Sequence, residues 1–201
     1  MPIGPGGLDA NGIWQFGEDD SEALASDLLN LGMGSVSTAL STLGGVLQVV
    51  SVTKTDVFSA SVLSTAFSAN VTGLSATITP SATSSTISVY VNVSGSTDLF
   101  PEVMGRLLRG ATPIGVGADD GIRTPVSGSA GNQYESNLAI ATLSVETMDT
   151  PATTSPITYN FQLFNRSIST ETLYVNRSRL DSNTARSMRP ASTMTLMEVA
   201  G

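Results

Sequence analysis

Apolar and polar residues alternate with a period of two along most of the chain after residue 45. The clearest case is residues 87–94, where Ile, Val, Val and Val alternate with Ser, Tyr, Asn and Ser. Such alternation is typical of a strand with one buried face and one face in solvent. The same alternation, or a β-branched bias, predicts further strands at residues 46–53, 74–79, 103–109, 138–148, 157–164, 172–176 and 193–199.

Short clusters of Pro, Gly, Asp, Asn, Ser and Thr separate these strands and mark turns. No helical pattern of about 10–15 residues follows residue 45, which excludes the crossover helices of a parallel α/β sheet. Eight or nine short strands, mostly polar on one face, predict a mainly β protein. Its expected fold is an antiparallel β-sandwich, jelly-roll-like, preceded by a short N-terminal arm and helix.

The first 45 residues have a different pattern. Residues 1–17 hold five glycines, two prolines and two aromatic residues. Because Gly and Pro break both helices and strands, this composition predicts an extended arm. We expect Trp14 and Phe16 to anchor the arm on another surface, since exposed aromatic side chains often carry interface contacts.

A short helix is predicted at residues 19–31, and a second helical stretch at 35–43. Asp19 and Glu22 have the spacing of a capping box. Apolar residues recur at i, i+4 and i+7 and form the expected contact stripe: Leu24, Leu28 and Leu31. Helices this short are marginal alone, so they pack either on their own domain or on another subunit or partner.

These patterns predict two parts in the chain. Residues 1–45 form an arm with short helices that serves anchoring or oligomerisation, and residues 46–201 form the β-sandwich domain. A chain of 201 residues is long enough for one ordinary domain with such an appendage.

Composition removes most familiar catalytic chemistry. Charged residues are 13% of the chain, and 28 serines and 24 threonines take their place. The chain has neither Cys nor His. Disulfides, thiolate nucleophiles, zinc sites built from Cys or His, and Ser-His or Cys-His triads are therefore excluded. We expect no enzyme activity, no catalytic residues, no cofactor and no metal.

The net charge of −8 arises from few cations, eight arginines and Lys54. Nucleic-acid binding and polybasic membrane binding both need clustered cations, so neither is expected. No run of about 20 apolar residues could span a bilayer. The first residues lack the basic region and apolar core of a secretory signal, which predicts synthesis in a cytoplasm.

The interval 110–137 is long, glycine-rich and polar, which is typical of a binding loop. Its Asp119-Asp120-Gly121 lacks the spaced acids and terminal Glu of a calcium loop, so a hydrophilic turn is the favoured interpretation. A host-surface glycan is the ligand considered for this loop.

Four acidic residues could in principle cleave sugars as a carboxylate pair: Glu102, Glu135, Glu146 and Asp149. The β region offers few aromatic platforms for such a groove, because Tyr159 and Phe161 alternate as core residues do. Five arginines cluster late in the chain: Arg166, Arg177, Arg179, Arg186 and Arg189. They suit a groove for an anionic polymer, ion pairs with the acidic N-terminal segment of another subunit, or plain solvation.

Two regions resemble known proteins. The string Gly12-Ile-Trp-Gln-Phe-Gly-Glu-Asp-Asp-Ser-Glu, followed by Ala-Ser-Asp-Leu-Leu-Asn-Leu-Gly32, resembles the N-terminal segment of tailed-bacteriophage virion proteins, often labelled minor tail proteins. The run Thr-Ile-Ser-Val-Tyr-Val-Asn-Val-Ser94, with Leu173-Tyr-Val-Asn-Arg-Ser178 and Met-Glu-Val-Ala-Gly201, is similar to a β domain of phage structural proteins.

The resemblance implies a non-enzymatic virion protein assembled in the host cytoplasm. It would be a homotrimer that contacts other capsid or tail proteins, as a capsid decoration, a head-fibre knob or a minor tail or tail-fiber protein. The alternative is a glycan-binding adhesion module that recognises the host surface. About 45 residues precede the first strand, which leaves little room for a long fibre shaft.

Overall fold

The computed structural model of the chain describes residues 7–8, 14–15, 45–131 and 137–201. The chain divides into two compact units, Met1–Gly45 and Val46–Gly201. In the first unit, β1 (Gly7–Leu8) pairs antiparallel with β2 (Trp14–Gln15). These two short strands lie within the predicted extended arm. The sequence between the two strands contains Asn-Gly, a strong hairpin signal.

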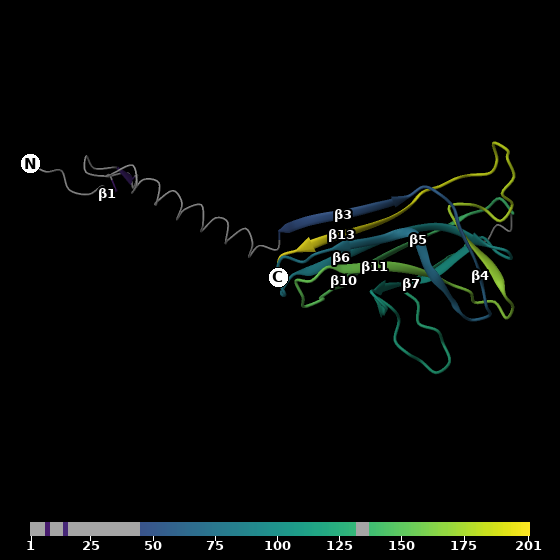
Figure 1. Cartoon of the computed structure of the whole chain (residues 1–201), viewed down its shortest axis with the longest axis horizontal. Helices are drawn as coiled ribbons and strands as arrows, with labels where there is room; N and C mark the ends of the chain where they lie inside the picture. The colour runs from purple at the N-terminus through teal and green to yellow at the C-terminus, as the bar shows by residue number, and fades with distance from the viewer. Residues whose placement is uncertain (1–6, 9–13, 16–44, 132–136) are drawn as a thin grey trace, which may run out of the picture. The chain divides into compact units, whose positions relative to one another are not determined.

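The second unit, the β domain, is a sandwich of two antiparallel sheets (Figure 1). The six-stranded sheet contains β3 (Val46–Lys54), β13 (Ser192–Val199), β6 (Thr86–Thr97), β12 (Glu171–Val175), β4 (Phe58–Val62) and β10 (Ala141–Asp149). The five-stranded sheet contains β5 (Phe67–Ile78), β11 (Ile157–Phe164), β7 (Glu102–Arg109), β8 (Thr112–Ile114) and β9 (Gly128–Gly131). The described residues contain no helix, and the helices predicted at 19–31 and 35–43 lie outside them.

Strand pairing in the β domain is nested. β3 pairs with β13, β5 with β11, β6 with β10, and β7 with both β8 and β9. The first strands of the domain thus pair with the last ones, and strands in the middle of the sequence pair with one another. This is the pairing of one long antiparallel hairpin that is folded into two sheets. This is the jelly-roll order, and it confirms the predicted antiparallel sandwich for residues 46–201.

β6 is the central strand of the six-stranded sheet. β10 pairs with residues 87–95 along one edge of β6. On the other edge β13 pairs with residues 86–92 and β12 with residues 95–97. Two short strands therefore share the edge of one long strand, and the junction between them must be closed by other groups.

Asn176 closes this junction from the residue directly after β12. Its side-chain amide donates to the carbonyls of Lys54, at 2.8 Å, and Asp56, at 3.0 Å. Its Oδ1 accepts a hydrogen bond of 2.7 Å from the Ser192 hydroxyl, and its backbone N–H donates to the Ser94 carbonyl at 2.8 Å. The backbone of Asn176 has φ +61, a left-handed conformation that Asn tolerates better than most residues. One buried side chain thus links the ends of β3, β12 and β13 to β6.

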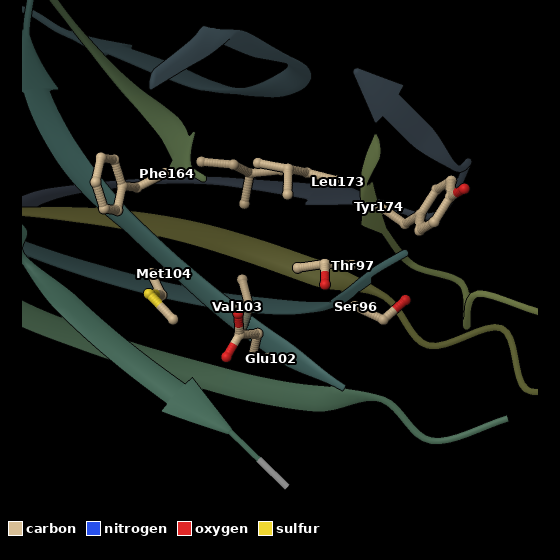
Figure 2. Close-up of a pocket in the computed structure, with 9 residues that line it drawn as sticks. Ser96, Thr97, Glu102, Val103, Met104, Phe164, Leu173 and Tyr174 are labelled. Atoms are coloured by element: carbon tan, nitrogen blue, oxygen red, sulfur yellow. The ribbon is translucent and has the colours of Figure 1, made fainter. Parts of the chain in front are cut away.

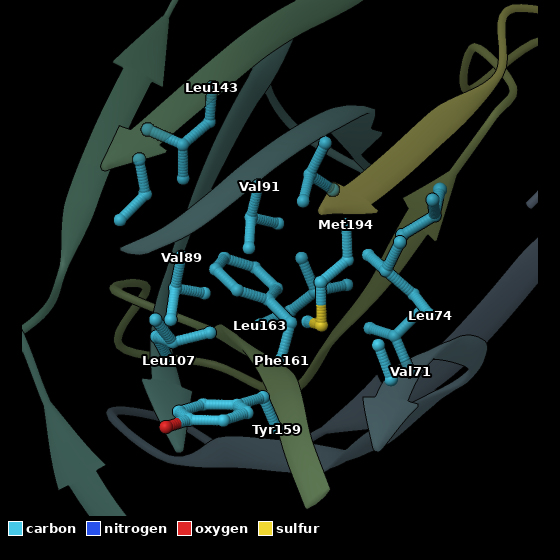
Figure 3. Packing of buried hydrophobic residues seen from close by; sticks show 14 of the residues in the cluster. Val71, Leu74, Val89, Val91, Leu107, Leu143, Tyr159, Phe161, Leu163 and Met194 are labelled. Atoms are coloured by element: carbon cyan, nitrogen blue, oxygen red, sulfur yellow. The ribbon is translucent and has the colours of Figure 1, made fainter. Parts of the chain in front are cut away.

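The core lies between the two sheets (Figure 3). β6 contributes four alternating residues that are almost fully buried: Ile87, Val89, Val91 and Val93. Tyr159, Phe161 and Leu163 of β11 face them from the other sheet, which confirms that the aromatic alternation in this strand is core. The Tyr159 hydroxyl donates to Asp149 Oδ2 at 2.6 Å, so the buried phenol keeps a partner.

Several strands were not predicted: β1, β2, β4, β9 and the first half of β5. Apolar and polar residues do alternate in β4, but the strand is only five residues long. The first half of β5 pairs irregularly with β11, and the register shifts there mark β-bulges. Its burial therefore does not follow period two, because Ser68 and Val71, three residues apart, are the buried side chains.

Glu198 of β13 is fully buried beside Ser81 and Gln48. Its Oε1 accepts hydrogen bonds from the Ser81 amide, at 2.7 Å, and the Ser81 hydroxyl, at 2.6 Å, and its Oε2 accepts one of 2.6 Å from Gln48 Nε2. Burial by itself raises the pKa of Glu198, but these hydrogen bonds to the charged form outweigh burial and lower the pKa to about 2.

We therefore expect acid to destabilise the β domain through Glu198. Stability from this lowered pKa is complete above the ordinary value of 4.5 and is lost as pH falls toward 2. The shift corresponds to about 3 kcal/mol. Urea unfolding of E198Q should show lower stability at pH 7 and a weaker dependence on pH between about 5 and 2. Glu146→Gln, on the exposed face of β10, is the control. Equal pH profiles for wild type and E198Q would contradict this role.

Candidate interaction surface at the loop end of the sandwich

Three connections meet at the end of the β domain that lies opposite the C-terminus: residues 63–66, 98–101 and 165–170 (Figure 1). They join β4 to β5, β6 to β7, and β11 to β12. The Ser64 hydroxyl donates to the Ser167 carbonyl at 3.0 Å, and Asp98 N donates to the Thr172 carbonyl at 3.1 Å. We call residues 63–66, 98–101 and 165–170 the loop-end surface.

Asn165 holds two of these loops together. It is buried directly after β11, and its side-chain amide donates to the carbonyls of Val62, Leu63 and Ser169 at 2.9, 3.1 and 2.9 Å. Its Oδ1 accepts from the Ser167 amide at 2.8 Å, the geometry of a local Asn turn. A single side chain therefore fixes the shape of the loop-end surface.

Large apolar side chains are exposed on this surface. Ile168 is 97% exposed and Leu63 is 70% exposed, and Leu99 and Phe100 are also in solvent. Exposed apolar residues that gather on one end of a domain, rather than scatter singly, mark an interaction surface. The loop-end surface therefore has the composition of a contact site.

An ion pair stands beside the exposed aromatic ring. Arg166 Nε donates to both carboxylate oxygens of Glu102, at 3.0 and 2.9 Å, and the guanidinium lies 5.3 Å from the centre of the Phe100 ring. The hydrogen bonds to Glu102 raise the pKa of Arg166 above its ordinary value. The guanidinium is thus fixed as a cation next to Phe100, a favourable cation–π arrangement.

A shallow recess, open to solvent, lies behind these loops (Figure 2). Residues of four strands line it: Ser96, Thr97, Glu102, Val103, Met104, Leu163, Phe164, Leu173 and Tyr174. Its free volume is about 10 Å³, which is room for about one water molecule. Ligand pockets usually measure about 300–1,000 Å³, so the recess by itself is too small to hold a ligand.

Asp98 organises the polar rim of the recess. Its carboxylate accepts hydrogen bonds from the Tyr174 hydroxyl, at 2.6 Å, and the Thr172 amide, at 3.0 Å. Burial opposes ionisation, yet these hydrogen bonds lower the pKa of Asp98 overall. The Arg177 guanidinium lies 4.3 Å from the centre of the Tyr174 ring. The rim is held rigidly by charged and aromatic groups.

Most of the late arginines have partners inside their own domain. Arg177 and Arg189 both pair with Asp181, and Arg166 pairs with Glu102. Arg179 contacts Asn137 Oδ1 at 3.4 Å, and Arg186 is exposed. This arrangement provides paired surface charges rather than a continuous basic groove.

The interval 110–131 forms β8, β9 and a connection at the edge of β7. Asp120 pairs with Arg123 across a tight turn at Gly121, which confirms the hydrophilic turn. In the described part of the chain, no group of three acidic side chains is close enough to hold a metal ion. Ile122 at this turn is fully exposed.

The acids considered for a carboxylate pair lie in different settings. Glu102 of β7 binds Arg166, whereas Asp149 of β10, in the other sheet, binds Arg109 at 2.8 Å. Glu146 lies on the exposed face of β10, and Glu135 falls outside the described residues. Glu102 and Asp149 are thus each held in an ion pair in separate sheets.

The predicted anchoring residues fall in the first unit. Trp14 belongs to β2 and pairs with Leu8. The other four lie outside the described residues: Phe16, Leu24, Leu28 and Leu31. The loop-end surface was not predicted from the sequence, because its three loops are distant in sequence and meet only in the folded domain.

No family model matches the chain, and no curated protein matches it. Among solved structures, the chain is similar to the infectious bursal disease virus VP2 subviral particle, with 14% identity and a TM-score of 0.38 over 76% of this chain and 38% of that chain. The T13 particle of the same virus gives 15% identity and a TM-score of 0.39, over 78% of this chain and 38% of that chain. The chain thus spans less than half the length of these proteins. Among the residues that the structure describes, no helix has the length and apolar character to span a bilayer.

Replacing Asn165 by Ala should loosen the loop-end surface. The substitution removes the Asn165 donor from the carbonyls of Val62, Leu63 and Ser169, of which the Leu63 carbonyl keeps the Ala66 N–H at 3.3 Å, and the loss of buried hydrogen bonds is costly. We expect a loss of about 2–3 kcal/mol in the free energy of unfolding, measured by urea denaturation. The matched control is Asn160→Ala in β11, the strand that precedes Asn165, where a single 3.4 Å contact to the Gly110 carbonyl is lost. Equal costs for the two variants would show that Asn165 does not have this structural role.

Proposed function

We propose that this chain is a non-enzymatic structural protein of a bacteriophage particle, displayed on the particle surface and anchored by residues 1–45. The position on the particle would be that of a capsid decoration or head-fibre knob, or of a minor tail or fibre protein. Trp14, Phe16 and the leucine stripe at residues 24–31 are the proposed anchoring contacts. The phage-like string that begins at Gly12 supports this proposal.

The single observation that carries the proposal is that the two ends of the β domain differ. Val46, where the domain begins, pairs with Val199 near its end, so both ends of the domain lie together. The loop-end surface lies at the opposite end (Figure 1). An anchor that enters at Val46 therefore leaves the loop-end surface free to face outward.

The β domain also has what an independent displayed module needs. Its core draws on both sheets and is complete within residues 46–201. Jelly-roll domains occur in viral capsids, lectins and cupins. Cupin-type metal chemistry needs His ligands, which this chain lacks. Capsid-surface and sugar-binding roles are the two that remain.

Deletion of residues 1–45 tests the anchor. We expect the truncated protein to keep a cooperative unfolding transition, because its core is intact, and to be lost from particles purified after complementation. Full-length protein with Ile122→Ala is the control, since that exposed side chain lies in the β8–β9 connection. Normal incorporation of the truncated protein would refute the anchoring role.

A second candidate is glycan binding at the host surface. The exposed Phe100 ring beside Arg166 and Glu102 is the observation that favours it, because ligand sites combine an apolar platform with a few fixed polar groups.

A glycan array with matched variants separates the two predicted binding positions. If the loop-end surface binds sugar, F100A should weaken binding about tenfold or more, a change of at least about 1.4 kcal/mol, while I122A should not. Loss of binding in I122A alone would assign the ligand to the 110–137 interval instead. Absence of binding by the wild-type protein would reject this candidate.

A further inference from the structure

One row of residues crosses the outer face of the six-stranded sheet from edge to edge. The register aligns Val49 of β3 with Met197 of β13, Met197 with Ser88 of β6, and Ser88 with Met148 of β10. Val49 and Met148, at the two ends of the row, are 56% and 57% exposed. Large apolar side chains are therefore exposed at both ends of this row, at opposite edges of the same face of the sheet.

The β3 side of this sheet is an unprotected strand edge. Residues 46–53 contain no charge, no Gly and no Pro, and Val46, Leu47 and Val49 are all exposed. Other edge strands in the described part are short, as in β4, β8 and β9, or irregular, as in β5, except β10, which is a second long and regular edge strand. Proteins normally blunt a long regular edge, because it recruits another strand or chain. The edge of β3 is thus suited to a contact.

Self-contacts between like edges fit these residues poorly. A contact between β10 strands of two copies would place Glu146, on the same face as Met148, near its symmetry mate. A contact between β3 strands of two copies would leave Met148 uncovered. A contact between β3 of one copy and β10 of the next covers both apolar edges and brings no like charges together.

The first 45 residues hold six of the seventeen acidic side chains and no basic one, so residues 46–201 carry a net charge of only −2. Long-range repulsion between β domains is therefore weak.

Strand directions allow this contact. β3 is antiparallel to β13, β13 to β6, and β6 to β10. β3 and β10 therefore run in opposite directions, and rotation about an axis along the strands places them side by side as antiparallel neighbours. All copies in such an arrangement point the same way, as the proposed anchoring at Val46 requires. A repeated head-to-tail contact of this kind closes into a ring when the rotation permits.

We propose that copies of this chain assemble head to tail into a closed ring, in which the β3 edge of one copy (Val46, Leu47 and Val49) packs against Met148 on the β10 edge of the next. The common orientation of the copies rests on the proposed function. The contact between the two edges rests on the β domain alone.

The absence of cysteine from the chain makes a sharp test possible. In full-length protein carrying V49C and M148C together, mild oxidation should give covalent oligomers larger than dimers on a non-reducing gel, ending at one fixed size. An internal disulfide is excluded, because three strand spacings separate the two positions by about 14 Å, beyond the Cα separation of about 7 Å that a disulfide tolerates. V49C with T142C is the matched control, since Thr142 lies on the same strand about 20 Å from Met148.

Each outcome decides the proposal. A ladder that ends at a fixed size for V49C/M148C, and its absence for V49C/T142C, supports the ring. A dimer from V49C alone would replace the ring by a two-fold contact between β3 strands. Monomers only would overturn any contact between copies at these edges, and an unlimited ladder would overturn closure. None of these results depends on incorporation into a particle, so the ring proposal and the anchoring proposal can each be rejected without the other.

Discussion

The β domain depends on the pairing of β6 along both of its edges. β10 satisfies one edge, but neither β13 nor β12 is long enough to cover the other. Asn176 allows β12 and β13 to share this edge of β6, because its side-chain amide donates to the carbonyls after β3 and its side-chain oxygen accepts from Ser192 at the start of β13. A buried side chain with these partners costs little, whereas an unfilled junction would leave several backbone groups unpaired in the core. The nested strand order and the position of the loops follow from this junction.

The same arrangement gives the domain two different ends. The Val46 end carries the connection to residues 1–45 and the apolar row that includes Val49 and Met148. The far end carries the loop-end surface, shaped by Asn165 and the ion pair of Arg166 with Glu102. Under the proposed function, assembly contacts would lie near the anchor and recognition contacts at the far end, separated by the length of the strands.

Much of the fold could be predicted from alternation alone, because one buried face imposes period two. β11 occupies the predicted residues 157–164, and β6 extends the prediction at 87–94 by one residue at its start and three at its end. β4 was not predicted because it is only five residues long and three of its side chains are small, and the start of β5 was not predicted because its bulges interrupt period-two burial. The loop-end surface could not be predicted, since its pair of Arg166 and Glu102 joins residues 64 apart in sequence. The predicted anchoring residues Phe16 and Leu24 remain predictions from sequence.

Electron cryo-microscopy of intact virus particles that carry the gene for this chain tests the central claim most directly. The account predicts jelly-roll density for this chain on the outside of the particle, in closed groups of copies, with the Val46 end toward the particle and the loop-end surface toward solvent. Particles that lack the chain altogether, or copies with the loop-end surface buried against the shell, would contradict it.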